Sequence, residues 1–127
     1  MNKKFLIAGA FFAAIAVMFG AFGAHYLKKI LTPESLQTFE VAVRYQFYHA
    51  IALLAAGILY KDFSGNLIKW AGNLFIGGIV LFSGSLYLLC AQPLWRWLGP
   101  VTPLGGLCFI GGWLLLAISF TKKNQHS

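Results

Sequence analysis

The chain has 127 residues, of which 59% are hydrophobic and only 10% are charged, and its formal net charge is +7. A soluble domain carries about 25% charged residues, so this chain lacks the polar side chains that a water-facing surface needs, and the composition excludes a soluble globular protein. The basic residues sit in short clusters between apolar runs, as is usual beside membrane spans, which also excludes a nucleic-acid-binding protein.

The first predicted element is a membrane helix over residues 5–28. No charged residue occurs from Phe5 to Leu27. At 1.5 Å per residue this run spans about 34 Å, enough to cross a hydrocarbon core of ~30 Å. Lysines precede the run, so a cleavable signal peptide is the competing interpretation, but the run is longer than the apolar core of such a peptide. It ends in the stretch GAFGAH, whose last residue is His25.

The second predicted helix covers residues 33–60 and follows Thr32–Pro33, a pair typical of a helix start. Glu40 and Arg44 are four residues apart, in the order that favours an ion pair on a helix surface. No charge follows Arg44 before the next turn. We therefore expect the helix to enter the hydrocarbon near Arg44, with His49 ~7 Å deeper.

The third and fourth predicted helices cover residues 67–91 and 103–120. Gln92–Pro93 ends the third helix, and the following loop carries two tryptophans around Arg96, an arrangement typical of a membrane interface. Thr102 before a proline predicts the start of the fourth helix. Together the four elements predict an all-α, integral membrane four-helix bundle, with residues 1–127 as a single domain.

Four spans place both ends of the chain on one side of the membrane. That side carries six basic residues and the other side carries four. The two sets are Lys3, Lys4, Lys61, Lys69, Lys122 and Lys123, and Lys28, Lys29, Arg44 and Arg96. Because basic loops stay in the cytoplasm, this distribution predicts that both termini are cytoplasmic.

Each predicted helix carries a stripe of small or polar residues at helical spacing. Membrane helices pack closely through such residues, so we expect the stripes to face neighbouring helices and the bulky residues between them to face lipid. The expected inward stripes are Ala10, Ala14, Ala21 and His25; Tyr45, His49, Ala52 and Ala56; Asn73, Gly77, Gly84 and Tyr87; and Gly105, Cys108, Gly112 and Ser119.

Polar residues on or beside these stripes form the candidate site. On the expected topology they all fall in the outer half of the membrane. The candidates are His25, Arg44, Tyr45, Tyr48, His49, Ser83, Ser85, Tyr87 and Thr102. Each also has a structural interpretation, because histidines and hydroxyls hydrogen-bond between helices and Arg44 can pair with Glu40. The cluster therefore predicts a binding site or a packing interface.

The sequence contains no motif for catalysis, for a cofactor or for a metal. Its acids are Glu34, Glu40 and Asp62, and none is expected at mid-membrane, which excludes an antiporter built on an embedded carboxylate and a charged pore ring. Cys90 and Cys108 lie in apolar runs without a CxxC spacing, so we expect buried thiols. We expect neither enzymatic activity nor a bound cofactor.

Two further functions stay open beside the leading one. The leading expectation is a structural or accessory protein that binds a membrane lipid, a small ligand or a protein partner, including a second copy of itself. The first alternative is a small proton-linked transporter that uses His25 and His49, since histidine titrates near neutral pH. The second is a haem or metal protein with the same two residues as ligands.

Several motifs in a fixed order make the chain resemble a known family. They are GAFGAH from Gly20 to His25, Tyr45-x-x-Tyr48-His49-Ala50, SGSLYLL from Ser83 to Leu89, LGPVTPLGGL from Leu98 to Leu107, and Gly112-Trp113. On these residues the chain resembles domain-of-unknown-function family 423, small four-helix membrane proteins of bacteria with transmembrane protein 256 as the eukaryotic branch. The resemblance implies a four-span, multi-pass bundle in the bacterial cytoplasmic (inner) membrane. It brings no activity, cofactor or functional residue.

Overall fold

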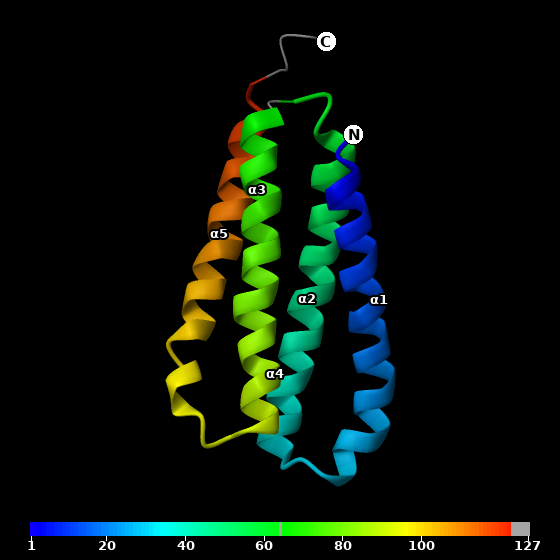
Figure 1. Cartoon of the computed structure of the whole chain (residues 1–127), viewed down its shortest axis with the longest axis vertical. Coiled ribbons are helices and arrows are strands. Elements are labelled where there is room, and N and C mark those ends of the chain that lie inside the picture. Colours follow the sequence, from blue (N-terminus) through cyan, green and yellow to red (C-terminus); the bar gives the residue numbers. More distant parts are fainter. Residues whose placement is uncertain (64, 123–127) are drawn as a thin grey trace.

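A computed structural model describes residues 1–63 and 65–122, which form four antiparallel, membrane-length helical segments (Figure 1). The elements are α1 (Lys3–Tyr26), the 3-10 turn η1 (Leu27–Lys29), α2 (Pro33–Leu59), α3 (Gly65–Gly78), the π-helical segment η2 (Ile79–Ser83), α4 (Gly84–Ala91), the 3-10 turn η3 (Arg96–Leu98) and α5 (Val101–Ser119). All four segments are long and apolar enough to cross a membrane, so the predicted all-α four-span bundle is confirmed. The bounds differ from those expected by at most two residues.

The segments lie in the order α1, α2, α3 with α4, and α5, so that α1 and α5 flank a central pair (Figure 1). The third segment is the continuous rod of α3, η2 and α4. The core lies mainly between this rod and α2, where Leu53, Ile68 and Phe75 are fully buried. Phe5 of α1 packs on one side of this core, and Phe109 of α5 packs on the other side.

Side chains cap the first two helices. The Asn2 side chain accepts a hydrogen bond from the Phe5 N–H at 3.2 Å, and the Asn2 N–H donates to the Gly57 carbonyl at 2.9 Å. The start of α1 is therefore tied to the end of α2. The Thr32 hydroxyl accepts from the Ser35 N–H at 3.1 Å, which satisfies one of the free donors at a helix start. The predicted cap of the second helix is confirmed.

The face of α1 that packs inward is not the one expected. The expected residues, all exposed, are Ala10, Ala14, Ala21 and His25. Instead, Gly9 faces Leu54 and Gly23 faces the Phe39 ring, and a Cβ at either glycine would lie within 3 Å of that neighbour. A large side chain of one helix thus fits over a glycine of the next. The buried residues of α1 are Phe5, Gly9, Ala16 and Gly23, so small residues do pack inward, but on a different face from the expected one, and their fit to large neighbours selects that face.

The inward faces of α2 and α5 agree better with expectation. His49, Ala52 and Ala56 are buried on α2, although Tyr45 is 39% exposed. On α5 the buried residues of the expected stripe are Gly105, Gly112 and Ser119, while Cys108 is half-buried. On these two helices the stripe of small or polar residues at helical spacing identifies the inward face.

The third segment departs from regular spacing at η2. The Gly84 N–H donates to the Ile79 carbonyl, five residues back, which inserts one residue into the turn. One residue turns a helix by about 100°, so a stripe drawn back from Tyr87 at regular spacing reaches the wrong face. Asn73 on that stripe is exposed, and Phe75 and Ile79 are buried instead.

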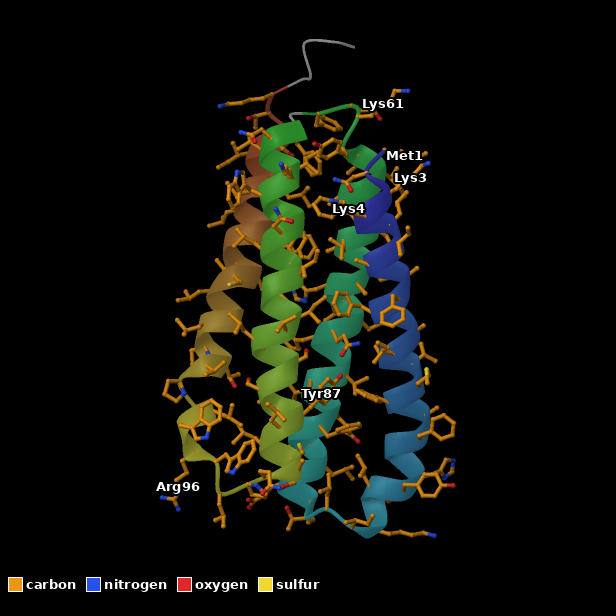
Figure 2. All side chains as sticks on the ribbon, in the orientation of Figure 1. Met1, Lys3, Lys4, Lys61, Tyr87 and Arg96 are labelled. Atoms are coloured by element: carbon orange, nitrogen blue, oxygen red, sulfur yellow. The ribbon has the colours of Figure 1, made fainter. Side chains whose placement is uncertain are left out.

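Charged residues mark the two ends of the bundle. Met1, Lys3, Lys4 and Lys61 lie at one end and Arg96 lies toward the other (Figure 2). α1 begins and α5 ends at the same end of the bundle, so the start of α1 and the end of α5 lie on one side of the membrane. Lys123, one of the six basic residues assigned to that side, lies outside the described residues.

Candidate functional site

Gln46 joins three helices near the middle of the bundle. Its side-chain amide donates to the Phe12 carbonyl of α1 at 2.8 Å, and its amide oxygen accepts from the Tyr87 hydroxyl of α4 at 2.7 Å. Gln46 is buried, and Figure 2 shows Tyr87 between α4 and α2. The rings of Phe19 and Phe39 lie 5.1 Å and 5.6 Å from that of Tyr87. The amide nitrogen and oxygen of Gln46 and the Tyr87 hydroxyl each have a hydrogen-bond partner, which indicates a structural link between the three helices.

His49 uses both of its ring nitrogens. Nδ1 lies 2.7 Å from the Tyr45 carbonyl, which can only accept, and Nε2 lies 3.0 Å from the Trp113 indole nitrogen, which can only donate. These partners require a neutral imidazole with its proton on Nδ1. The Phe109 ring stacks on the imidazole at a centroid distance of 3.5 Å. His49 is therefore held by packing and bonding, with no free lone pair.

Ser83, Ser85 and Thr102 form hydrogen bonds in and beside the π-helical segment η2. The Ser83 hydroxyl donates to the Ala42 carbonyl of α2 at 2.7 Å. The Ser85 hydroxyl donates to the Phe82 carbonyl at 2.9 Å and shares a short hydrogen bond with the Thr102 hydroxyl of α5. α5 begins one residue before Thr102, so this threonine links two helices and does not cap one. The hydroxyls hold η2 between α2 and α5.

The nine candidate residues do not meet in one cluster. His49 lies about 24 Å along α2 from its start, in the second half of the helix, whereas His25 lies in the last turn of α1. His25 is exposed and borders a cavity of about 420 Å³ with Phe22, Tyr26 and Lys29.

The two histidine-based alternatives find no support in this arrangement. His25 and His49 belong to different regions, and Trp113 occupies the His49 lone pair that a metal, haem or proton would need. Among the residues that the structure describes, no group of three or more His, Cys, Asp or Glu side chains could hold a metal ion. Cys90 is a buried free thiol that donates to the Ser35 carbonyl at 3.2 Å.

A groove between α1 and α2 contains two of the candidate residues, Arg44 and Tyr48. Its larger compartment, about 390 Å³, is almost entirely apolar, and its lining residues are Ala16, Val17, Gly20, Ala21, Val43, Arg44, Phe47 and Tyr48. A smaller compartment of about 170 Å³ adjoins it, lined by Gly20, Leu36, Phe39, Glu40, Val43 and Arg44. Gly20, Val43 and Arg44 line both compartments. We call the two together the α1–α2 groove.

Arg44 and Glu40 stand in this groove without a salt bridge. Both side chains are exposed. Within residues 1–63 and 65–122, no hydrogen bond or ion pair involves either of them, so the expected pair between them does not form. Tyr48, 52% exposed, forms part of the apolar wall. The groove thus holds two opposite charges, one helical turn apart, each without a partner in the described chain.

Three residues of these arrangements are absent from the sequence-based candidates. Gln46 could have been found, because it is a polar amide three residues before His49, on the same side of a charge-free helix. Trp113 lies in a motif noted in the sequence, but its donor role depends on the approach of α5 to α2. From the sequence, Glu40 is expected only as an ion-pair partner for Arg44. Its place in the groove follows from the packing of α1 on α2.

Comparison with known proteins gives a consistent picture. A family model described as "Protein of unknown function (DUF423)" matches residues 19–106. A UPF0382 membrane protein of Staphylococcus saprophyticus is 48% identical over 120 residues, covering 94% of this chain and 98% of the relative. UPF0382 membrane proteins of Staphylococcus haemolyticus and Bacillus subtilis are 46% and 42% identical, each over 94% of this chain and 97% and 98% of the relative. No solved structure matches the chain significantly.

Proposed function

The chain belongs to the DUF423 family of proteins of unknown function, and for this membrane protein we propose a binding function: it holds a membrane phospholipid in the α1–α2 groove. We further propose that it lies in the bacterial cytoplasmic membrane, because its relatives are membrane proteins of bacteria. The distribution of basic residues favours both termini in the cytoplasm. On this proposal the protein is not an enzyme and needs no cofactor. The bound lipid comes from the outer leaflet, toward which the Glu40 end of the groove opens.

The unpaired guanidinium of Arg44 is the observation that carries the proposal. A charged side chain on the membrane-facing surface of a helix is costly unless it reaches water or meets a counter-charge. Arg44 lies where the two compartments of the groove meet. A guanidinium binds phosphate oxygens through two parallel hydrogen bonds, which makes arginine a suitable residue for a lipid phosphate.

The larger compartment supplies a surface for an acyl chain. Its α1 wall is low, because Ala16, Gly20 and Ala21 have little or no side chain, and its other wall includes Phe47 of α2. At Gly20 the groove floor is the Val43 side chain. An extended hydrocarbon chain can lie in such a shallow apolar channel while its phosphate remains beside Arg44.

Lipid retention by purified protein tests the proposal. We expect the wild-type protein in mild detergent to retain a phospholipid, detected by native mass spectrometry, and Arg44→Ala to weaken phospholipid binding at least tenfold, the loss expected for one strong charge-assisted contact. Arg96→Ala is the matched control, because Arg96 is an exposed arginine outside the groove. It should bind like the wild type.

A second variant fills the groove without touching the charge. A Cβ at Gly20 would lie 3.5 Å from Val43, an ordinary contact, so Gly20→Leu should fold and occupy the apolar compartment. We expect it to reduce phospholipid binding while helicity, measured by circular dichroism, stays at the wild-type level. Equal phospholipid binding by wild type, Arg44→Ala and Gly20→Leu would overturn the proposed function.

A further inference from the structure

Glu40 gives the groove a second charge at a defined place. It lies one helical turn, about 6 Å, from Arg44 toward the start of α2. Both residues line the smaller compartment, and only Arg44 reaches the larger one. From the middle of α2 toward its start, the groove therefore presents an apolar wall, then a cation, then an anion.

This order matches the covalent order of one class of lipid. In an aminophospholipid the acyl chains are followed by a phosphate and then by an ammonium group. With the chains in the apolar compartment, the phosphate meets Arg44 and the ammonium lies about one helical turn farther on, at Glu40. We propose that the groove selects a phospholipid whose headgroup carries a primary ammonium group beyond its phosphate, of which phosphatidylethanolamine is the simplest example. This inference rests on the proposed function, because it concerns the lipid held at the same site.

Other lipid headgroups interact less favourably with the Glu40 carboxylate. A glycerol headgroup gives the carboxylate no positive charge, and a phosphomonoester adds negative charge beside it. A choline headgroup has the charge but no N–H to donate. Near the edge of the hydrocarbon region charges interact more strongly than in bulk water, so an unmatched carboxylate opposes binding of the wrong lipid. The carboxylate thus supplies selectivity, and Arg44 supplies affinity for the phosphate that all phospholipids share.

A lipid competition experiment on the intact chain tests the inference. Delipidated protein in detergent is offered dioleoyl phosphatidylethanolamine, phosphatidylglycerol and phosphatidylcholine, and the bound species are counted by native mass spectrometry. We expect a preference of roughly tenfold for phosphatidylethanolamine over phosphatidylglycerol, equivalent to one well-placed charge contact. Glu40→Gln should remove this preference while total phospholipid binding stays dependent on Arg44. Glu40→Lys should reverse the preference toward phosphatidylglycerol.

Glu34→Gln is the matched control, because Glu34 is an exposed acid on the same helix that does not line the groove. It should keep the wild-type preference. If the wild type and Glu40→Gln bind all three lipids equally, but Arg44→Ala weakens them all, the selectivity inference fails and the proposed function stands. If Arg44→Ala leaves the binding of every lipid unchanged, the proposed function itself fails.

Discussion

Single polar residues link helices of this bundle. Gln46 contacts a backbone carbonyl on α1 and a hydroxyl on α4, and His49 contacts the indole of α5. Water is absent from a bilayer core, so each of these groups would be costly without its partner. The partners are backbone or side-chain groups of a neighbouring helix, or, for one nitrogen of His49, of its own helix. Both polar atoms of the Gln46 amide and both ring nitrogens of His49 have a partner, whereas the charges of the groove have none in the described chain.

Tyr87 offers a direct measure of one such link. We expect Tyr87→Phe to lower the free energy of unfolding by about 0.5–1.5 kcal/mol, because it removes one hydrogen bond and keeps the ring among Phe19 and Phe39. Gln46→Leu should lower it by about 1–3 kcal/mol, because it also leaves the Tyr87 hydroxyl unpaired in the core.

Unfolding in mixed micelles with increasing dodecyl sulfate, followed by circular dichroism, gives these free energies. Tyr26→Phe is the control, since Tyr26 is exposed and its hydroxyl has no hydrogen bond in the part of the chain that the structure describes. A loss for Tyr87→Phe no larger than for Tyr26→Phe would show that the hydroxyl contributes nothing to stability.

Whole helices pack through glycines that receive large neighbours. Gly78 lies under the Phe109 ring of α5, and Gly105 of α5 lies against the backbone of Phe82. The second contact falls within η2, so the π-helical turn and Gly105 fit together. The neighbouring Gly106 has open space where a Cβ would be. Two adjacent glycines of one motif therefore have different roles, which depend on the face that each occupies.

This contrast predicts opposite outcomes for the same substitution. Gly105→Ala should destabilise the bundle by about 1–3 kcal/mol, because its Cβ would collide with the Phe82 backbone, which cannot turn aside as a flexible side chain can. Gly106→Ala should be neutral or stabilise by up to about 1 kcal/mol, because alanine favours the helix and meets nothing. Micelle unfolding of both variants checks the pair, and similar free energies for the two would contradict the packing of α5 on η2.

Apart from Arg44 and Glu40 of the groove, the molecule carries its charges at or toward its ends, with four apolar segments between them. The start of α1 and the end of α5 share one end with Lys61, and Arg96 lies toward the opposite end (Figure 2). The basic residues at the first end outnumber those toward the second, which predicts that the first end faces the cytoplasm. The Glu40 end of the groove then opens to the outer leaflet.

Substituted cysteines test this orientation. In a Cys90→Ser, Cys108→Ser background, we expect Gln92→Cys to react with a membrane-impermeant maleimide in intact cells. Asp62→Cys should react only after the cells are opened, because it lies in the turn at the other end. Serine at residue 90 keeps a donor for the Ser35 carbonyl, so the background should fold. The reverse labelling pattern would place both termini outside.

The sequence by itself determined the four membrane spans, the cap of α2 and the inward faces of α2 and α5, because composition and regular helical spacing act locally. Only the tertiary structure decided the inward faces of α1 and α3. The α1 face depends on glycines that receive Leu54 and Phe39 from another helix, and the α3 face depends on one inserted residue at η2. The groove, with Arg44 and Glu40 unpaired inside it, likewise depends on how α1 and α2 pack. A contact between two helices depends on the side-chain sizes of both. The sequence of one helix alone therefore does not determine which of its faces packs inward.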